Sequence, residues 1–107
     1  MDVRHQHALT LVTCGDREEG HAIARHLVEA RLAAGVQIIP IESVYTWEGE
    51  VVEDQEWLLI AKTRRDRFDQ IKAVVEELHS YEVPPVLMID IDAAGRPYLD
   101  WIDASVE

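Results

Sequence analysis

The sequence predicts an α+β fold in which an antiparallel sheet carries two helices on one face. Apolar runs short enough for strands alternate with two segments whose apolar residues recur at the spacing of an amphipathic helix. Two of the runs follow each other across a tight turn, which predicts a long β-hairpin. The resulting element order is β-α-β-β-α-β, followed by a short tail.

The first strand and the first helix occupy the N-terminal third of the chain. Residues 8–14 are apolar and rich in β-branched side chains, so we expect a buried strand. Asp16, with Glu19 three residues later, resembles a capping box and predicts a helix start. Apolar residues at helical spacing extend this helix over residues 17–34, and Gly35 stands where a C-cap glycine is expected.

The hairpin is predicted from residues 36–47 and 51–62. Its first strand changes the face of its apolar residues around Pro40, which predicts a bulge or a sheet edge, because proline cannot donate to a strand ladder. Its second strand is apolar on both faces over residues 57–61, as is typical of a central strand. Strands of about 11 residues span about 37 Å. The hairpin should therefore project from a body whose radius of gyration is about 13 Å.

The aromatic residues of the hairpin indicate self-association. Tyr45 and Trp47 stand two residues apart and project from one face of the strand, and Trp57 lies on the return strand. Five carboxylates crowd the tip and the start of the return strand: Glu48, Glu50, Glu53, Asp54 and Glu56. Proteins usually cover exposed apolar area and strand edges. We therefore expect the hairpin to contact other copies of the chain.

The second half of the chain completes the pattern. A helix is expected to start at Thr63 or Asp66 and to end before Pro84. Its predicted core stripe consists of Phe68, Ile71, Val75 and Leu78. Residues 86–91 predict the fourth strand, and residues 98–102 predict a short last helix. Together these elements predict a ferredoxin-like sandwich with a long hairpin between its second and third strands.

Length and charge limit the classes of function. A chain of 107 residues is expected to form a single domain, residues 1–107, with its own core. A net charge of −11 repels phosphate backbones and anionic lipid, so we expect no nucleic-acid and no membrane partner. No apolar run reaches the roughly 18 residues of a membrane helix, and the start of the chain lacks a secretion signal. The single cysteine, Cys14, fits a reducing compartment, so a cytoplasmic location is predicted.

Cys14, His79 and Glu82 form the first candidate site, which would bind a metal ion. His79 and Glu82 stand three residues apart, a spacing that places two ligands on one helix turn. Cys14 adds a soft donor of the kind that suits copper. The alternative interpretation is structural, with His79 capping the end of its helix and Glu82 pairing locally.

Tyr45, Glu56, Lys62 and Tyr81 form the second candidate site. Glu56 and Lys62 are six residues apart on one strand and therefore share a face. A polar pocket of this kind, beside aromatic rings, could bind a small anionic or zwitterionic ligand at a cleft between subunits. The alternative is an interfacial salt bridge that fixes the register of an assembly.

The remaining residues carry no clear chemistry. His5 and His7 share a strand face near the terminus, where a metal ion could bridge them, but we expect both to be simply exposed. The sequence has no catalytic-triad pattern, no glycine-rich phosphate loop and no zinc-ligand spacing, so it predicts a binding protein rather than an enzyme. No cofactor is expected to be required for folding.

Four spaced blocks of the sequence resemble the CutA family of divalent-cation tolerance proteins. The blocks are Tyr45-x-Trp47-x-Gly49, Glu56 with Lys62-Thr63, His79-x-Tyr81-Glu82-x-Pro84, and Tyr98-Leu99-x-Trp101-Ile102. They run in order through the second half of the chain. Val12-Thr13 and Ile39-Pro40 extend the resemblance over nearly the full length.

The resemblance implies a tight homotrimer of ferredoxin-like protomers, with hairpins pairing between subunits, similar in architecture to PII-type signalling trimers. It also implies a response to divalent metal ions and the binding of copper. The alternative is a PII-like regulatory module that binds a small ligand or a partner protein at clefts between subunits. The sequence departs from the family at two expected ligand positions, which Val12 and Pro85 occupy. Cys14 keeps the strand face of Val12 but shifts the thiol by about 7 Å.

Overall fold

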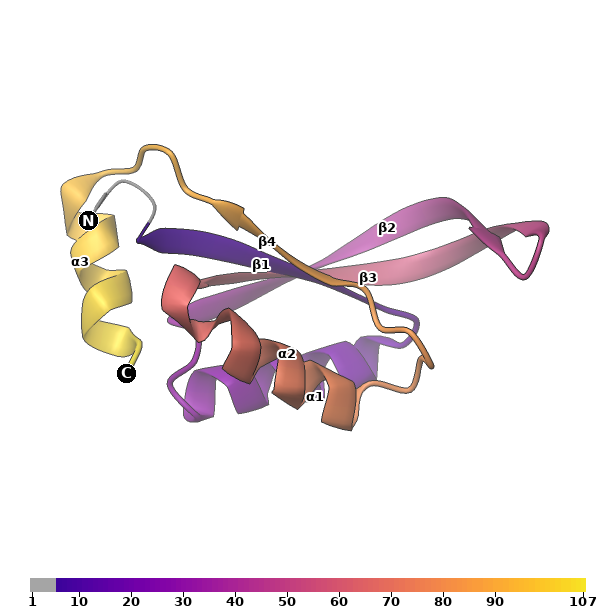
Figure 1. Ribbon diagram of the computed structural model, residues 1–107, viewed down its shortest axis with the longest axis horizontal. Coiled ribbons are helices and arrows are strands. Elements are labelled where there is room, and N and C mark those ends of the chain that lie inside the picture. The colour runs from indigo at the N-terminus through magenta and orange to yellow at the C-terminus, as the bar shows by residue number, and fades with distance from the viewer. Residues whose placement is uncertain (1–5) are drawn as a thin grey trace.

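The computed structural model describes residues 6–107 and consists of one antiparallel sheet with two helices packed on one face (Figure 1). The strands are ordered β2-β3-β1-β4, and each neighbouring pair is antiparallel. The elements are β1 (His7–Cys14), α1 (Arg17–Glu29), β2 (Gly35–Trp47), β3 (Glu50–Arg64), the 3-10 turn η2 (Arg65–Arg67), α2 (Phe68–Leu78), β4 (Val86–Asp90) and α3 (Arg96–Ser105). The predicted α+β class and element order are confirmed.

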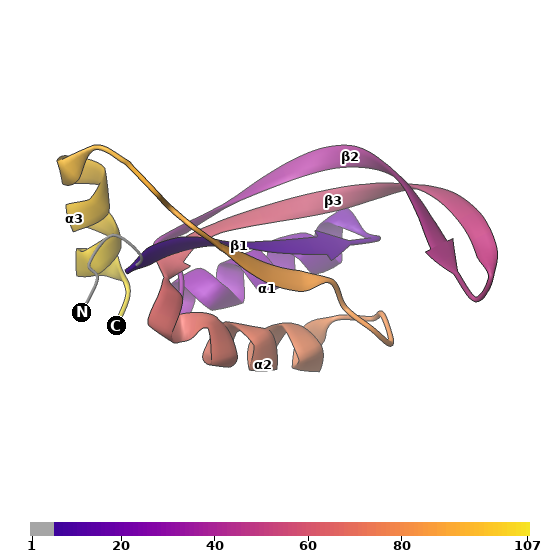
Figure 2. The same ribbon diagram turned by 45° about the horizontal axis from the view of Figure 1, so that its top comes forward.

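The core lies between the sheet and the layer formed by α1 and α2 (Figure 2). The two helices contribute apolar stripes, and the sheet contributes the alternate side chains of β1 and β3 that face them. Removal of these side chains from water is the main stabilising contribution to the fold. The buried cluster consists of Val12, Cys14, Ile23, Leu27, Ala33, Leu59, Ala61, Ile71 and Val75.

The hairpin of β2 and β3 extends beyond the rest of the sheet. The prediction of a bulge or a sheet edge at Pro40 is confirmed by the second alternative, because β2 is an edge strand. The register runs without a bulge from Gly35 opposite Lys62 to Trp47 opposite Glu50. Pairing of β3 with β1 ends at Cys14, so the tip of the hairpin projects, and the molecule measures 43 × 25 × 22 Å.

The first helix ends earlier than predicted. α1 ends at Glu29, and Arg31 adopts a left-handed conformation with φ of 59°. The backbone N–H groups of Leu32 and Ala33 then donate to the Leu27 carbonyl at 2.9 and 3.1 Å, which satisfies the end of the helix. Gly35 is therefore the first residue of β2 rather than a C-cap, because this turn closes before the chain reaches it.

The second helix begins later than predicted. β3 continues through Thr63, whose hydroxyl donates to the Leu32 carbonyl at 2.6 Å, and the α-helix starts only at Phe68. Ile71 and Val75 are fully buried as predicted. Leu78 is 39% exposed, so its predicted place in the core is wrong, because the helix ends there.

α3 packs across the end of the sheet where β1 begins. The ring of Trp101 lies so close to Gly35 that a Cβ atom there would be 3.0 Å from it, which explains the glycine. His7 is only 5% exposed, and its Nε2 lies 3.0 Å from Oδ1 of Asp103. The predicted exposure of His7 is therefore wrong, while His5 lies outside the described residues.

The face of the sheet opposite α1 and α2 carries a group of apolar side chains. The strand registers place alternate residues of all four strands on this open face, where Ile39, Leu87 and Ile89 are 40%, 49% and 47% exposed. We define the open face by Leu9, Leu11, Ile39, Leu58, Ile60, Leu87 and Ile89. Contiguous apolar surfaces of this kind mark interaction sites.

Candidate functional site

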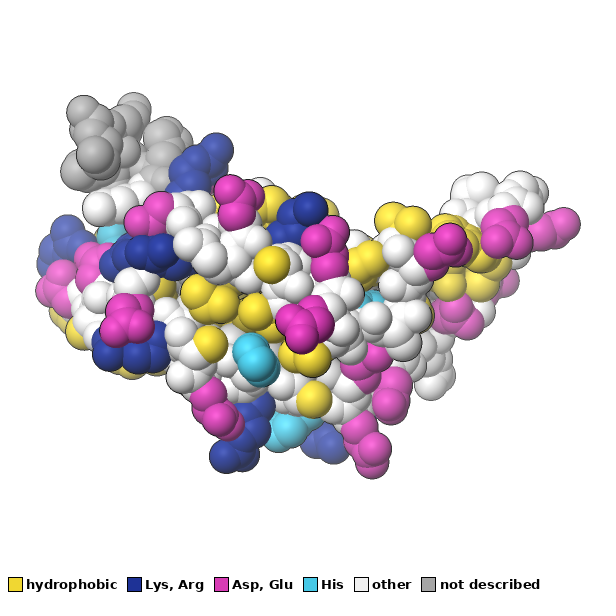
Figure 3. Space-filling model, turned by 60° about the horizontal axis from the view of Figure 1, so that its bottom comes forward, with side chains coloured by type: hydrophobic (Ala, Val, Ile, Leu, Met, Phe, Trp, Pro, Cys, Tyr) yellow, Lys and Arg dark blue, Asp and Glu magenta, His cyan; other side chains and the backbone are white. Residues whose placement is uncertain are grey.

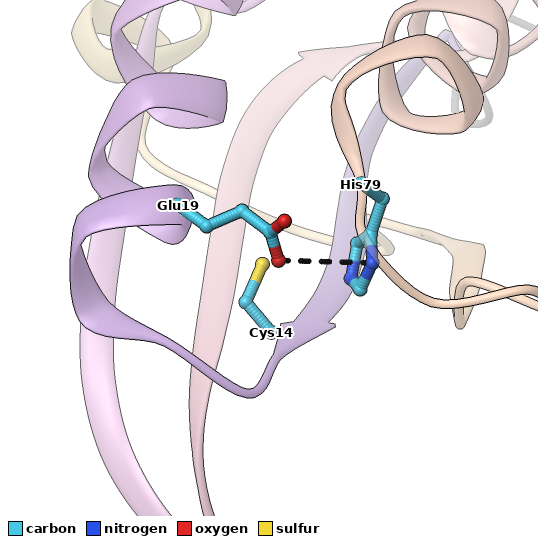
Figure 4. Close-up of side chains that lie close together, drawn as sticks. All are labelled: Cys14, Glu19 and His79. Carbon is cyan, nitrogen blue, oxygen red and sulfur yellow. Dashed lines mark ion pairs between the residues drawn. The ribbon is translucent and has the colours of Figure 1, made fainter.

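Cys14, Glu19 and His79 meet at one end of the sheet (Figure 4). Cys14 is the last residue of β1, Glu19 lies in the first turn of α1, and His79 follows the last residue of α2. One sulfur, one carboxylate oxygen and one ring nitrogen lie within 4.8 Å of one another. Among residues 6–107 this is the one group of three or more such side chains that could hold a metal ion.

Both ring nitrogens of His79 take part in hydrogen bonds that fix the orientation of the ring. Nε2 lies 2.6 Å from the carbonyl oxygen of Thr13, which can only accept, so Nε2 carries the proton. Nδ1 accepts the backbone N–H of Tyr81 at 3.0 Å. The lone pair of Nδ1 is therefore the ring's only donor for a metal, and it already serves Tyr81.

Glu19 completes the group, although the sequence indicated a different role for it. Asp16 caps α1 by accepting from the backbone N–H of Glu18 at 3.3 Å, as expected for an N-cap. The Glu19 side chain points instead to the end of α2. Its Oε2 accepts from the Ser80 hydroxyl at 3.1 Å and lies 3.8 Å from Nδ1 of His79. The predicted capping-box partner is therefore wrong.

Cys14 is fully buried, and this controls its chemistry. Burial raises the pKa of the Cys14 thiol to about 12, and the nearby carboxylates of Glu19, Glu56 and Asp16 add to the increase. The thiol is therefore protonated and unreactive at neutral pH. A bound cation would have to displace this proton, because the thiolate is the form that binds metals.

We expect Cys14 in the folded protein to react with iodoacetamide at pH 8 about three orders of magnitude more slowly than in urea. A thiol with a pKa near 12 has that much less thiolate than an ordinary cysteine. Glu19→Gln should speed the reaction, because removing this negative charge lowers the pKa of the thiol. Glu18→Gln, the neighbouring carboxylate on α1, serves as the control and should leave the rate unchanged. Equal rates in the folded and unfolded protein would contradict the assignment.

A cavity of about 750 Å³ lies between the hairpin and residues 81–85, which link α2 to β4. Two tyrosine–carboxylate pairs stand at its wall. The Tyr81 hydroxyl donates to Glu56 at 2.7 Å, and the Tyr45 hydroxyl donates to Asp54 at 2.5 Å. The hydrogen bond to Asp54 raises the pKa of Tyr45 to about 12, while burial and the bond to Glu56 raise the pKa of Tyr81. Both phenols are therefore neutral hydrogen-bond donors at neutral pH.

The structure brings together three of the four residues of the second predicted site. Tyr45, Glu56 and Tyr81 line the cavity, but Lys62 does not. Lys62 shares a strand face with Glu56, yet it lies six residues, or about 20 Å, further along β3. Its ammonium group donates to Gln37, and burial lowers the pKa of Lys62.

The predicted metal ligand Glu82 belongs to the cavity instead, and a different glutamate joins Cys14 and His79. Glu82 lies in the segment after α2 and lines the cavity, while Glu19 takes its place beside Cys14 and His79. Glu19 was not predicted as a site residue, because its spacing from Asp16 indicated a local role in capping α1. Asp54 was not predicted either, because the sequence does not distinguish it from the other four carboxylates near the tip of the hairpin.

Comparison with known proteins identifies the family. A family model described as CutA1 divalent ion tolerance protein matches residues 8–105. The Divalent-cation tolerance protein CutA of Thermus thermophilus is 46% identical over 95 residues, which cover 88% of this chain and 92% of that protein. The protein of the same name from Archaeoglobus fulgidus is 39% identical over 101 residues, covering 94% of this chain and 99% of that one.

Solved structures agree with this assignment. The divalent cation tolerance protein from Thermus thermophilus superposes with a TM-score of 0.91 at 43% identity, covering 94% of this chain and 99% of that chain. CutA1 from Oryza sativa superposes with a TM-score of 0.92 at 39% identity, covering 95% of this chain and 94% of that chain.

Relatives are described as periplasmic in Archaeoglobus fulgidus and chloroplastic in Arabidopsis thaliana, so the cytoplasmic location stays a prediction. None of the helices within residues 6–107 is long and apolar enough to cross a membrane. Sequence and structure together show that the chain belongs to the CutA1 divalent ion tolerance protein family.

Proposed function

We propose that this protein is a homotrimeric divalent-cation tolerance protein that binds a metal ion, with copper as the preferred ion, through Cys14, Glu19 and His79. The observation that carries the proposal is the convergence of a thiol, a carboxylate and an imidazole from three different elements within 4.8 Å. Thiolate and imidazole ligands favour copper and zinc over magnesium or calcium. The proposed role is binding rather than catalysis.

The donor set fits such an ion after small side-chain movements. Zinc ligand atoms lie about 2.0–2.3 Å from the metal, so in a tetrahedral site they are roughly 3.3–3.8 Å apart. The three atoms here lie within 4.8 Å of one another, so inward shifts of about 1 Å bring them into range. The family's expected ligand positions are filled here by Val12 and Pro85. The proposed ligands are therefore the three side chains that converge in this structure.

The trimer proposal rests on the open face and the projecting hairpin. Leu87, Ile89 and Ile39 expose between 40% and 49% of their surface in the isolated chain. The long edge strand β2 also presents unpaired backbone groups, which proteins usually cover. Packing of the open faces against one another would remove the apolar surface from water.

Calorimetric titration with Zn²⁺ tests the metal site, because Zn²⁺ has no redox chemistry with a thiol. We expect one Zn²⁺ per chain, and Glu19→Gln should weaken its binding about tenfold or more. Cu⁺, kept reduced, should then displace the Zn²⁺ if copper is the preferred ion.

Glu18→Gln is the matched control. It removes the same charge at the position next to Glu19, from a side chain that lies outside the group. It should retain full affinity. Equal losses in both variants would show that Zn²⁺ responds only to the acidic surface. That result, or the absence of saturable binding, would contradict the metal proposal.

A second candidate function is supported by the cavity between the hairpin and residues 81–85. Its volume of about 750 Å³ lies within the range of small-molecule sites, roughly 300–1,000 Å³. The family resemblance to PII-type trimers suggests a regulatory module that binds a small ligand or a partner protein at such a cleft. Cys14 and Glu19 are not part of the lining of this cavity, so variants at these two residues test the metal site without changing the cavity wall.

A further inference from the structure

The cavity has an acidic wall. The carboxylates of Glu42, Asp54, Glu56 and Glu82 line it, and the lining contains no Lys, Arg or His. Residues 32–61, which contain all of β2 and most of β3, include six carboxylates and no basic residue or histidine. Figure 3 shows acidic and apolar side chains on the hairpin, with the Lys and Arg side chains on the body of the molecule.

Glu56 provides a second observation, separate from the number of carboxylates, that favours a positively charged ligand. Its side chain belongs to a residue that is only 5% exposed. One oxygen accepts from the neutral Tyr81 hydroxyl, and the other has no hydrogen-bond partner among residues 6–107. No cation lies within ion-pair distance of Glu56 in this part of the chain. A largely buried carboxylate is stabilised by a paired cation, so the second oxygen of Glu56 is the point in this wall where a ligand's positive charge would gain most.

The rest of the lining indicates which kind of cation would fit. Tyr45, Trp47 and Tyr81 supply aromatic faces, which attract organic cations. Val44, Val83 and Pro85 add an apolar surface. The cavity carboxylates do not converge as metal ligands, because the one such group among the described residues is Cys14, Glu19 and His79. A bare metal ion would also leave most of the volume unfilled.

We propose that this cavity binds a small organic cation, an ammonium or guanidinium compound with an apolar group, whose charge pairs with Glu56 and whose apolar part contacts Trp47. The proposal deepens the second candidate function and rests on the cavity being a ligand site. It differs from the sequence-based expectation of an anionic or zwitterionic ligand. That expectation depended on Lys62, which lies outside the cavity.

NMR titration of the full chain, in its native assembly, with three isosteric probes tests the proposal. The probes are phenethylamine, 2-phenylethanol and phenylacetate, which differ in charge at one position. We expect phenethylamine alone to bind saturably and to shift the indole N–H of Trp47. Glu56→Gln, which keeps the shape and can still accept from Tyr81, should weaken binding at least about tenfold. Glu42→Gln, on the exposed edge strand, should weaken it several-fold without affecting folding.

Glu53→Gln is the matched control, because it removes the same charge from β3 at a residue outside the lining. It should bind phenethylamine like the native chain. Equal losses in Glu53→Gln and Glu56→Gln would indicate attraction to net charge alone and would overturn the proposal. Binding of the alcohol or the acid at Trp47 would overturn the cationic class but retain the cavity as a ligand site. If no probe binds the native assembly, the proposal fails.

Discussion

Ile89→Glu is expected to be a monomer in light scattering at micromolar concentration, whereas the proposed native trimer should be a particle of about 37 kDa, three times the 12.2 kDa chain. Ile89 is 47% exposed on the edge strand β4, so an isolated chain can carry glutamate there. In a trimer the same carboxylate would be buried between open faces without a partner. An uncompensated buried charge costs on the order of 3–5 kcal/mol, and each trimer would contain three of them.

Val28→Glu provides the matched comparison. Val28 is 40% exposed on α1, in the layer on the other side of the sheet, and it undergoes the same change from a β-branched apolar residue to glutamate. This variant should remain trimeric. A native particle of about 12 kDa would contradict the trimer itself. A trimeric Ile89→Glu variant would show that the open face is not the interface.

The local elements of the fold follow from the sequence, but their ends depend on tertiary contacts. The alternation in β1 and the helical spacing of Ile71 and Val75 predict the correct faces, because side-chain direction has a fixed period in each element. The end of α1 could not be predicted in the same way. Glycine is the usual C-cap, yet Arg31 adopts the left-handed conformation here. The turn that follows is held by Leu27 and Thr63, which belong to different elements.

The candidate sites show the same limit at a larger scale. The alternation of side chains along a strand correctly placed Glu56 and Lys62 on one face of β3. This alternation carries no information on whether two residues line the same cavity. His79 and Glu82 do not lie on one helix turn as their spacing predicted, because α2 ends at Leu78, before either residue. Glu19 reaches His79 only because α1 and α2 pack side by side, which no local pattern encodes.

The two sites are connected through Tyr81. Its N–H donates to Nδ1 of His79, while its hydroxyl donates to Glu56 at the cavity wall. A metal ion bound to Nδ1 would displace the Tyr81 N–H, so the two sites compete for the position of one residue. Coupling of this kind is reciprocal, because each ligand must change the affinity of the other by the same factor.

The affinity of the Cys14 group for Zn²⁺ is expected to rise about tenfold per pH unit between pH 6 and pH 8, and therefore about a hundredfold over this range. Burial holds the pKa of the thiol near 12, so the thiol is protonated throughout, and each bound ion must release that proton. Lower proton concentration then favours the complex. The His79 hydrogen bonds already place a lone pair on Nδ1, so the ring releases no proton. Calorimetry in buffers of different ionisation enthalpy measures both the affinity and the number of protons released.

Cys14→Ala separates this site from the other histidines, which bind Zn²⁺ better as pH rises because they lose their own protons. The variant removes the thiol proton but leaves His21 and His26, which are exposed on α1. It should lose the tight site and release about one proton fewer per ion bound. If the native protein and Cys14→Ala show the same affinity and the same proton release at every pH, the thiol is not a ligand. The metal would then have to bind away from the end of β1.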